Sequence, residues 1–339
     1  MNRIAQMPAA KRAEVLGETA DRKRLPEAVV EKDFWVCWVL KQLFSIETFQ
    51  DRLLFKGGTS LSKIFKAIHR FSEDIDLAVD YAALGFVGEK DPRREGISRT
   101  KQLQILEEMM TACQRYIAEE FLQELGYRFE SVLGAPGEWR LDVHPDDPNI
   151  VRFAYPRAVS KTVSYVRPVV ILEMGTHAEF IPRDRFSLHS FVAEEFPDLD
   201  PEQEVRVVAL AARRTFWEKI TILHAEYHRP PDKALPGRYS RHYYDVAMMA
   251  RGPIKEAALA DRELLARVVR HKRIFYPSAW ARYDLAQLGT LRLLPENSRV
   301  TALRRDYREM GVMIFGEPPA FDAIFAVSTR RAPALIRIQ

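Results

Sequence analysis

The segment from residue 53 to residue 79 constrains the fold more than any other part of the chain. Leu53-Leu54-Phe55 is a short apolar run typical of a strand, and the Gly57-Gly58 pair after it favours a tight turn. A helix is then predicted by four apolar residues at helical spacing, Leu61, Ile64, Phe65 and Ile68. Acidic and apolar residues alternate from Asp74 to Val79, which predicts a second strand. Because one short helix connects the two strands, we expect Asp74 and Asp76 to lie at the same end of the sheet as the glycine turn.

Further strands and helices extend this segment into a mixed domain. Residues 27–46 are densely apolar and predict a buried helix, and residues 100–125 predict a long amphipathic helix after a loop at 84–99. Four strand-like runs follow between residues 127 and 174, namely YRFESV, EWRLDV, IVRFAY and RPVVILEM. We therefore expect an α+β domain with a mixed or antiparallel sheet over residues 1–200.

The rest of the chain favours helices. Helical spacing begins near Val205 and is present in four segments, 209–227, 240–251, 254–272 and 295–313. Prolines punctuate a polar stretch at 180–204, which predicts a boundary between two domains. We expect a helical second domain over residues 201–339, and 339 residues with 47% hydrophobic content are enough for two packed modules.

Composition excludes several classes of protein. The chain has 51 Lys and Arg against 47 Asp and Glu, which excludes a histone-like or polybasic-tail protein. Its two cysteines, Cys37 and Cys113, cannot build a disulfide framework or a cysteine-based zinc site, and their scarcity fits a reducing compartment. No apolar signal segment and no run of about 20 apolar residues is present, so we expect a cytoplasmic protein with no membrane partner.

The glycine turn has the features of a phosphate site. Gly57 and Gly58 let the backbone approach a ligand closely, the start of the following helix offers unpaired N–H groups, and Thr59 and Ser60 add hydroxyl donors. The spacing matches neither the Walker A loop nor the dinucleotide-binding glycine motif. Taken alone, such a turn is more often an ordinary tight turn than a ligand site.

The two aspartates after this turn make the hypothesis more specific. Asp74 and Asp76 share one face of the predicted strand, where two carboxylates repel each other unless a cation lies between them. Mg²⁺ binds through one or two carboxylates together with substrate phosphates. The pair alone indicates a solvated strand face, whereas the pair beside a phosphate-binding turn predicts a metal-dependent nucleotide site.

These residues resemble the signature of a known family. Residues 55–63 (FKGGTSLSK) and 70–77 (RFSEDIDL) are similar to motifs of the AbiEii/AbiGii toxin family of nucleotidyltransferases, relatives of polymerase β and of the mycobacterial MenT toxins. The resemblance covers about residues 27–325. It extends to residues 31–35 (EKDFW), 214–219 (RTFWEK), 240–245 (SRHYYD) and 306–307 (DY), and to Met310.

The resemblance implies a nucleotidyltransferase-like domain whose active-site cleft is completed by the helical domain. It implies an enzyme that uses Mg²⁺, with Mn²⁺ as the alternative, to transfer NMP from an NTP to an acceptor hydroxyl with release of pyrophosphate. Such an enzyme would be a toxin of a toxin–antitoxin or abortive-infection system for phage defence, with tRNA as a candidate acceptor and an AbiEi-like antitoxin as partner. The nucleotide-binding residues expected on this basis are Lys56, Gly57, Gly58, Thr59, Ser60, Lys63, Arg70 and Arg241.

A third carboxylate usually completes a metal site of this kind beside Asp74 and Asp76. Glu173 is the first candidate, because it ends an apolar run read as a central strand, where a buried acid is costly without a cation or a hydrogen-bonded partner. Asp142 is the second candidate and lies on a polar alternating face. The resemblance also favours Glu173, because family members carry a glutamate at the end of such a strand.

Lys219 and Asp245 are the candidate catalytic residues of the helical domain. Lys219 borders the apolar face of a predicted helix, and composition alone indicates an ordinary solvated lysine beside Glu218. The resemblance implies instead that Lys219 neutralises the triphosphate. Asp245 either orients Lys219 or Arg241 by an ion pair or serves only as a structural anchor.

Two other functions use similar residues. A metal-dependent nuclease also clusters acids, but it usually places a lysine two residues after the last acid, where this chain has Gly175. The other is a non-catalytic protein that binds nucleotides or RNA on the same scaffold, and the intact acids, turn and Lys219 argue against it. Residues 205–241 hold eight Lys and Arg against three acids, which indicates either a solvated face or a groove for an RNA backbone.

Overall fold

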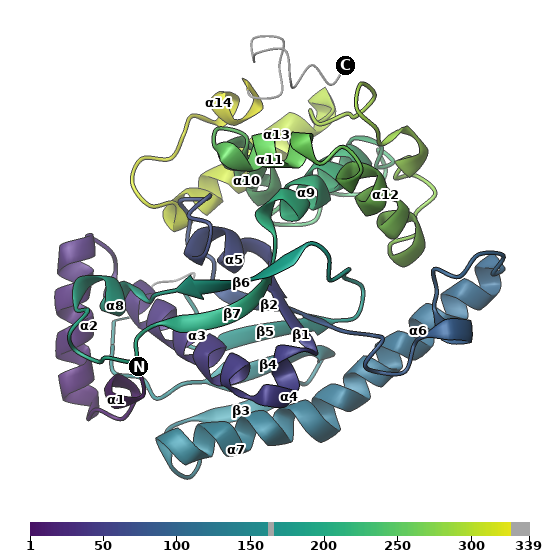
Figure 1. The fold of residues 1–339 in the computed structure, drawn as a ribbon. Helices are drawn as coiled ribbons and strands as arrows, with labels where there is room; N and C mark the ends of the chain where they lie inside the picture. The colour runs from purple at the N-terminus through teal and green to yellow at the C-terminus, as the bar shows by residue number, and fades with distance from the viewer. Residues whose placement is uncertain (162–165, 327–339) are drawn as a thin grey trace. The chain divides into compact units, whose positions relative to one another are not determined.

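A computed structural model of the chain describes residues 1–161 and 166–326. The chain forms two compact units, which Figure 1 shows as ribbons. The first unit contains Met1–Ile64 and Ser72–Leu210, and the second contains Phe65–Phe71 together with the residues from Ala211 onward. A short segment of the second unit thus interrupts the first. Residues 327–339, which the sequence analysis assigned to a helical domain, lie outside the described residues.

The first unit is built on a mixed sheet of seven strands in the order β3-β4-β5-β2-β1-β7-β6. Its strands are β1 (Leu53–Lys56), β2 (Asp74–Val79), β3 (Arg140–His144), β4 (Asp147–Ala154), β5 (Val170–Gly175), β6 (Arg183–Leu188) and β7 (Val205–Leu210). The central strand β2 pairs antiparallel with β1 and parallel with β5. This sheet and its helices confirm the predicted α+β class.

One face of the sheet is covered by an aromatic core. The helices of this unit are α1 (Asn2–Ala5), α2 (Ala9–Lys23), α3 (Glu27–Ser45), α4 (Glu47–Gln50), α5 (Gly57–Lys63), α6 (Arg99–Tyr116), α7 (Leu122–Leu133) and α8 (Phe191–Glu195). Trp38 of α3 contacts Phe129 of α7 and Phe153 of β4, with ring centroids 4.7 and 5.7 Å away. Ile75 and Leu77 of β2 are buried in the same core, so the alternate residues of that strand face the other side of the sheet.

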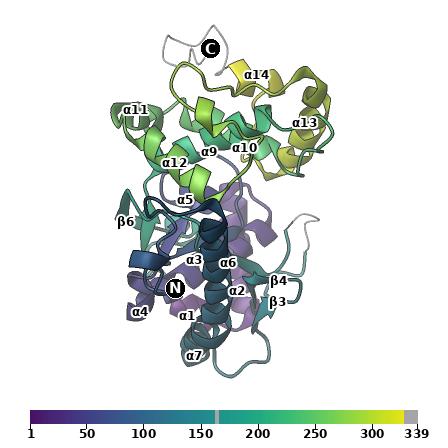
Figure 2. The same cartoon turned by 90° about the vertical axis from the view of Figure 1, so that its right-hand side faces the viewer.

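Two predicted elements of this unit were wrong. The run YRFESV, expected to be a strand, belongs to α7, because Leu125, Phe129 and Val132 bury one face at helical spacing. A π-helical turn joins α6 to α7, and Figure 2 shows the two helices as one long rod. The helix predicted to reach Ile68 ends at Lys63, and Lys66 beyond it has a positive φ of 50°, which an α-helix cannot contain.

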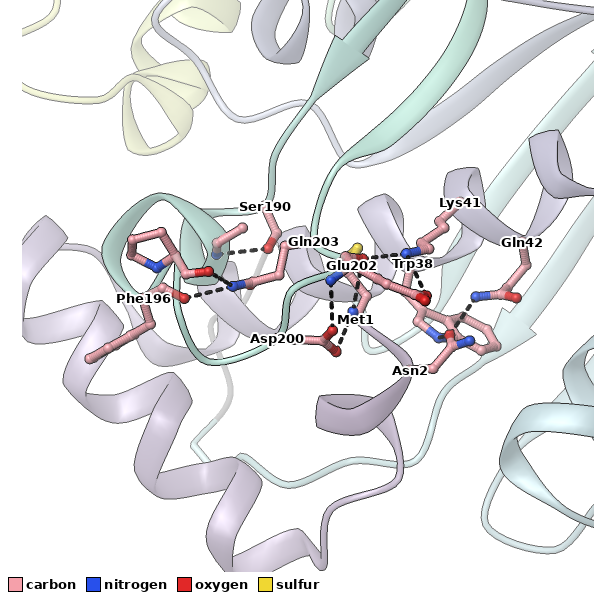
Figure 3. Close-up of polar contacts among 12 residues, drawn as sticks. Met1, Asn2, Trp38, Lys41, Gln42, Ser190, Phe196, Asp200, Glu202 and Gln203 are labelled. Carbon is pink, nitrogen blue, oxygen red and sulfur yellow. Dashed lines mark hydrogen bonds and ion pairs between the residues drawn. The ribbon is translucent and has the colours of Figure 1, made fainter.

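A network of polar contacts ties the start of the chain to the segment before β7 (Figure 3). The Met1 ammonium group lies 2.5 Å from the Asp200 carboxylate, and both groups are buried. The Asn2 side chain accepts hydrogen bonds from Trp38 and Gln42 of α3 at 3.1 and 2.8 Å. These bonds hold the start of the chain against α3, and Trp38 takes part both in them and in the aromatic core.

The second unit is helical. Its helices are α9 (Ala212–Tyr227), α10 (Ser240–Met249), α11 (Pro253–Ala260), α12 (Leu264–Phe275), α13 (Asn297–Met310) and α14 (Phe321–Ala326). Helical structure begins at Ala212, because the apolar run at 205–210, where helix was expected, forms the sheet strand β7. The segment 254–272, predicted as one helix, is divided between α11 and α12. Among the described residues, no helix is both long and apolar enough to cross a membrane.

The interrupting segment Phe65–Phe71 is held by backbone hydrogen bonds within the second unit. The N–H of Phe71 donates to the carbonyl of Met313 at 2.7 Å, and the N–H of Phe315 donates to the carbonyl of His69 at 2.8 Å. Arg70 and Ile314 form an isolated antiparallel bridge between these bonds. The residues immediately before the acidic strand β2 are therefore anchored in the helical unit.

Candidate active site

The predicted acids lie on the face of the sheet opposite the aromatic core. Asp76 of β2 is in register with Glu173 of β5 and with Lys56 of β1. Residues paired in this way point to the same face, so Lys56, Asp76 and Glu173 form one row across three strands. Asp74 lies two residues before Asp76 on the same face, and both aspartates are half-buried. The structure thus brings together acids that are about a hundred residues apart in the sequence.

The expectation that Glu173 is buried was wrong. It is exposed, because it lies on the polar face of β5 while Leu172 and Met174 enter the core. The competing acid, Asp142 on β3, lies within 2.7 Å of both Arg140 and Arg152. Three strand spacings of about 4.8 Å each separate β3 from β2, against one spacing for β5. The geometry favours Glu173 over Asp142 as a neighbour of the aspartates.

Gly57 provides the space that the Asp76 carboxylate occupies. Its φ of +80° lies in the region that favours glycine, and a Cβ placed on it would lie 1.9 Å from Oδ2 of Asp76. Gly57 therefore allows the Asp76 side chain to lie close to the backbone, and it also allows the chain to change direction. The predicted turn is itself the first turn of α5, since that helix begins at Gly57.

If the chain is the nucleotidyltransferase that the resemblance implies, Gly57→Ala should reduce nucleotide transfer by about 10²-fold, because a misplacement of about 1 Å in a group of the active site has an effect of this size. The alanine forces the Asp76 side chain away and strains the backbone. The control is Gly85→Ala, since Gly85 has a φ of +90° with no atom within 4 Å of the added Cβ. Equal activity losses in the two variants, measured as kcat/KM, would mean that backbone strain alone is responsible.

Three polar residues of α5 make contacts within the first unit. Thr59 donates a hydrogen bond to the backbone carbonyl of Asp74 at 2.5 Å, which ties α5 to the acidic strand. The Ser60 hydroxyl donates to the carbonyl of Gly57 at 2.9 Å, and Gly58 lies in the same turn. Lys63 is buried against Asp33 at 2.6 Å. These contacts position the helix and its neighbour β2.

Three consecutive charged residues of α3 belong to the EKDFW motif of the family resemblance, but the sequence predicted no structural role for them. Glu31, Lys32 and Asp33 are all buried in a largely apolar helix. Glu31 accepts a hydrogen bond from the N–H of Ala158 at 2.6 Å, and Asp33 accepts one from the N–H of Phe191 at 2.7 Å.

The middle residue of this triplet, Lys32, lies 3.1 Å from the Glu73 carboxylate and also donates to the carbonyls of Arg167 and Val169. Since Glu73 directly precedes Asp74, this ion pair anchors the start of the acidic strand. A buried charge is tolerated only with partners, so charges within an otherwise apolar helix were the signal that could have identified these residues.

The donor set at the acid row is suited to a hard divalent cation. Asp74 and Asp76 offer carboxylate oxygens on one face, and the exposed Glu173 lies at the paired position of the next strand. In the part of the chain that the structure describes, no group of three or more potential ligands is close enough to hold a metal. Two carboxylates completed by substrate phosphates are sufficient for Mg²⁺.

The second unit contains its own charged cluster. Arg70 donates two hydrogen bonds to Asp245, at 2.8 and 2.9 Å, and the Lys219 ammonium lies 2.9 Å from the same carboxylate. Burial by itself raises the pKa of Asp245, but the charges of Arg70 and Lys219 outweigh it and hold that pKa well below its ordinary range. Asp245 thus pairs with Lys219, one of the two partners considered from the sequence, and also with Arg70.

His242 also contributes to this cluster. Its Nδ1 lies 3.5 Å from the Lys219 ammonium. Burial lowers the pKa of His242 well below its ordinary value, and the charges of Lys219 and Arg241 lower it further. An ammonium group can only donate, so a neutral His242 accepts this contact. The predicted residue Arg241 is exposed at the start of α10.

Comparison with known proteins gives a consistent result. A sequence model of the family described as "Nucleotidyl transferase AbiEii toxin, Type IV TA system" matches residues 38–327. Among solved structures, the fold is similar to that of MenT4, a nucleotidyltransferase toxin from Mycobacterium tuberculosis H37Rv, with a TM-score of 0.50 and 18% identity. That match covers 96% of this chain and 88% of MenT4. No curated protein matches the chain in sequence.

Proposed function

Because the chain belongs to the AbiEii family of nucleotidyltransferase toxins, we propose that it transfers NMP to a hydroxyl group of RNA, with tRNA as the candidate acceptor, in a Mg²⁺-dependent reaction. The observation that carries the proposal is the acid row, in which Asp76 pairs in register with Glu173 and lies directly over Gly57. A cognate AbiEi-like antitoxin is the proposed partner, and the cytoplasm is the proposed compartment.

In the proposed reaction, an acceptor oxygen attacks the α-phosphorus of the NTP, the bond to the β-phosphate oxygen breaks, and pyrophosphate leaves. Asp74 and Asp76 would hold Mg²⁺ or Mn²⁺ together with phosphate oxygens of the NTP, and Glu173, at the paired position on β5, is the candidate third ligand. The metal would lower the pKa of the attacking hydroxyl and stabilise the transferred phosphoryl group. The N–H groups at the start of α5, from Gly57 onward, would bind phosphate oxygens, since no side chain caps them.

The charged cluster of the second unit would contribute the positive charge. Lys219 would contact the triphosphate, and Asp245 would hold Lys219 in place without entering the reaction. Among the other residues predicted to bind nucleotide, Lys56 lies on the acid row, whereas Arg70 and Lys63 are engaged by Asp245 and Asp33. We therefore propose that Arg70 and Lys63 position their acidic partners, in addition to the nucleotide contacts expected from the sequence.

The test is incubation of the purified protein with each α-labelled NTP and total RNA, with Mg²⁺ or with EDTA. We expect label on RNA for at least one NTP, release of pyrophosphate, and no transfer in EDTA. A nuclease would shorten the RNA without incorporating label. Absence of labelled RNA with all four NTPs, from a protein that remains folded, would reject the proposal.

A further inference from the structure

The charges of the chain are divided unequally between its units. By sequence, the first unit carries 26 Lys and Arg against 34 Asp and Glu, and the second carries 25 against 13. Their formal net charges are therefore −8 and +12, although the whole chain carries only +4. Such an excess is typical of a surface that binds a polyanion, because each phosphate contact releases counterions. The helical unit is the part of the chain suited to nucleic acid.

Within this unit, α12 presents unpaired arginines to solvent. One side of the helix is buried through Leu264, Val268 and Phe275, and Arg270 and Arg273 are exposed on the other. The two arginines are three residues apart and so are neighbours on the helix surface. Across residues 1–161 and 166–326, neither lies within ion-pair distance of a carboxylate, unlike many other exposed arginines. A hydrogen bond from Arg282 lowers the pKa of Asp284, and the charge of Arg273 helps to lower it.

An aromatic residue lies at the end of the same helix. Tyr276, directly after α12, leaves 43% of its surface exposed, and the Lys272 ammonium lies 4.3 Å from its ring centroid. An exposed ring next to one cation, at the end of a helix with two further exposed arginines, is the combination that single-stranded nucleic acids bind, because bases stack on the ring while the cations contact the backbone. A purely electrostatic surface would not need the ring.

We propose that Arg270, Lys272, Arg273 and Tyr276, here called the α12 face, bind the acceptor RNA through its phosphates and one stacked, unpaired base. The inference rests on the proposed function in taking RNA as the acceptor, and it adds where on the chain the RNA docks. An acidic protein would also be attracted to the arginines. The exposed ring and the charge of +12 across the unit favour RNA.

The test measures RNA binding by fluorescence anisotropy with labelled tRNA and with a single-stranded oligoribonucleotide, without NTP or metal. Arg270→Glu/Arg273→Glu should weaken binding at least 10-fold and lower the slope of log K against log salt by about 1.4 for the single strand, at about 0.7 per lost contact. Tyr276→Ala should weaken binding about 5- to 150-fold, the range for one stacked base, without changing the slope.

The matched control is Arg305→Glu/Arg308→Glu, which reverses two exposed arginines at the same spacing on α13. Equal weakening by both double variants would reduce the effect to net charge and overturn the inference. Unchanged RNA binding by Arg270→Glu/Arg273→Glu would also overturn the inference. If that variant instead lost the binding of an acidic protein, the α12 face would be a protein-binding surface and not an RNA-binding one. Circular dichroism and thermal melting establish that each variant is folded.

A separate arm distinguishes this inference from the proposed function. Asp76→Asn should bind RNA as the unaltered protein does, since the acid row is not on α12. An unaltered protein that transfers no nucleotide but binds RNA through the α12 face would reject the proposed function and support the docking surface. A protein that transfers nucleotides to RNA equally well with and without the α12 arginines would reject the docking surface alone.

Discussion

Asp76→Asn should lower nucleotide transfer by well over about 10²-fold while the protein remains folded. Loss of one carboxylate removes a proposed metal ligand at the centre of the acid row, and with it much of the charge stabilisation of an in-line displacement. Thermal stability should be unchanged or slightly higher, because Asp74 and Asp76 lie on the same strand face and repel each other. Kinetics of label incorporation and a melting curve measure the two effects separately.

Asp142→Asn is the control for this prediction. Asp142 faces arginines on the far strands of the same sheet, so its loss should leave transfer within a few-fold of the starting value. Nucleotide transfer that persists in a folded Asp76→Asn variant would contradict the proposed metal site. A large loss of transfer in Asp142→Asn, with normal transfer in Glu173→Gln, would show that Asp142 and not Glu173 is the third carboxylate.

Asp245→Asn should destabilise the protein by about 3–5 kcal/mol, the usual cost of removing one partner from a buried ion pair. The side chains of Arg70 and Asp245 are 5% and 0% exposed, so the remaining Arg70 and Lys219 would be buried without their counter-charge. Urea denaturation at neutral pH measures the change. A midpoint that does not move would show that the cluster is solvated and that Asp245 has no structural role.

The pH dependence of this effect has a definite sign. The pKa of Asp245 is lower in the folded protein than in the unfolded chain, so the carboxylate stabilises the fold at neutral pH. The pKa of Asp245 in the unfolded chain is about 4. The stabilisation is therefore lost as the pH falls below about 4 toward the lower pKa that Asp245 has in the folded protein. Asp284→Asn, at an exposed carboxylate paired with Arg282, is the control and should leave the midpoint unchanged.

The local order of strand, glycine turn, helix and acidic strand could be predicted because neighbouring residues determine it. Alternation placed Asp74 and Asp76 on one face, and the structure agrees with that. The position of Glu173 beside Asp76 depends on a parallel pairing between distant strands, which periodicity cannot reveal. An apolar run predicted burial there, although Glu173 at the end of that run is exposed on the face away from the core.

The contacts of the charged residues could not be predicted either, because they also join residues that are distant in the sequence. Lys63 and Asp33, or Arg70 and Asp245, give no signal in a local window, because each partner is supplied by a different element. The run YRFESV fits both a strand and a helix, and the choice depends on the core residues that the helix α7 contacts. Local patterns therefore identified the acids, and tertiary structure supplied their neighbours.

The interrupted order of the two units also determines when the charged cluster can form during synthesis. Arg70 and Asp245 are 175 residues apart in the chain. At about 5–20 residues per second, a ribosome adds Asp245 roughly 10–35 s after Arg70. During that time the nascent chain contains the segment at 65–71, but neither Asp245 nor the residues Met313 and Phe315 whose backbone bonds hold the segment. A product of translation that stops before Asp245 therefore lacks the cluster, however well its sheet has folded.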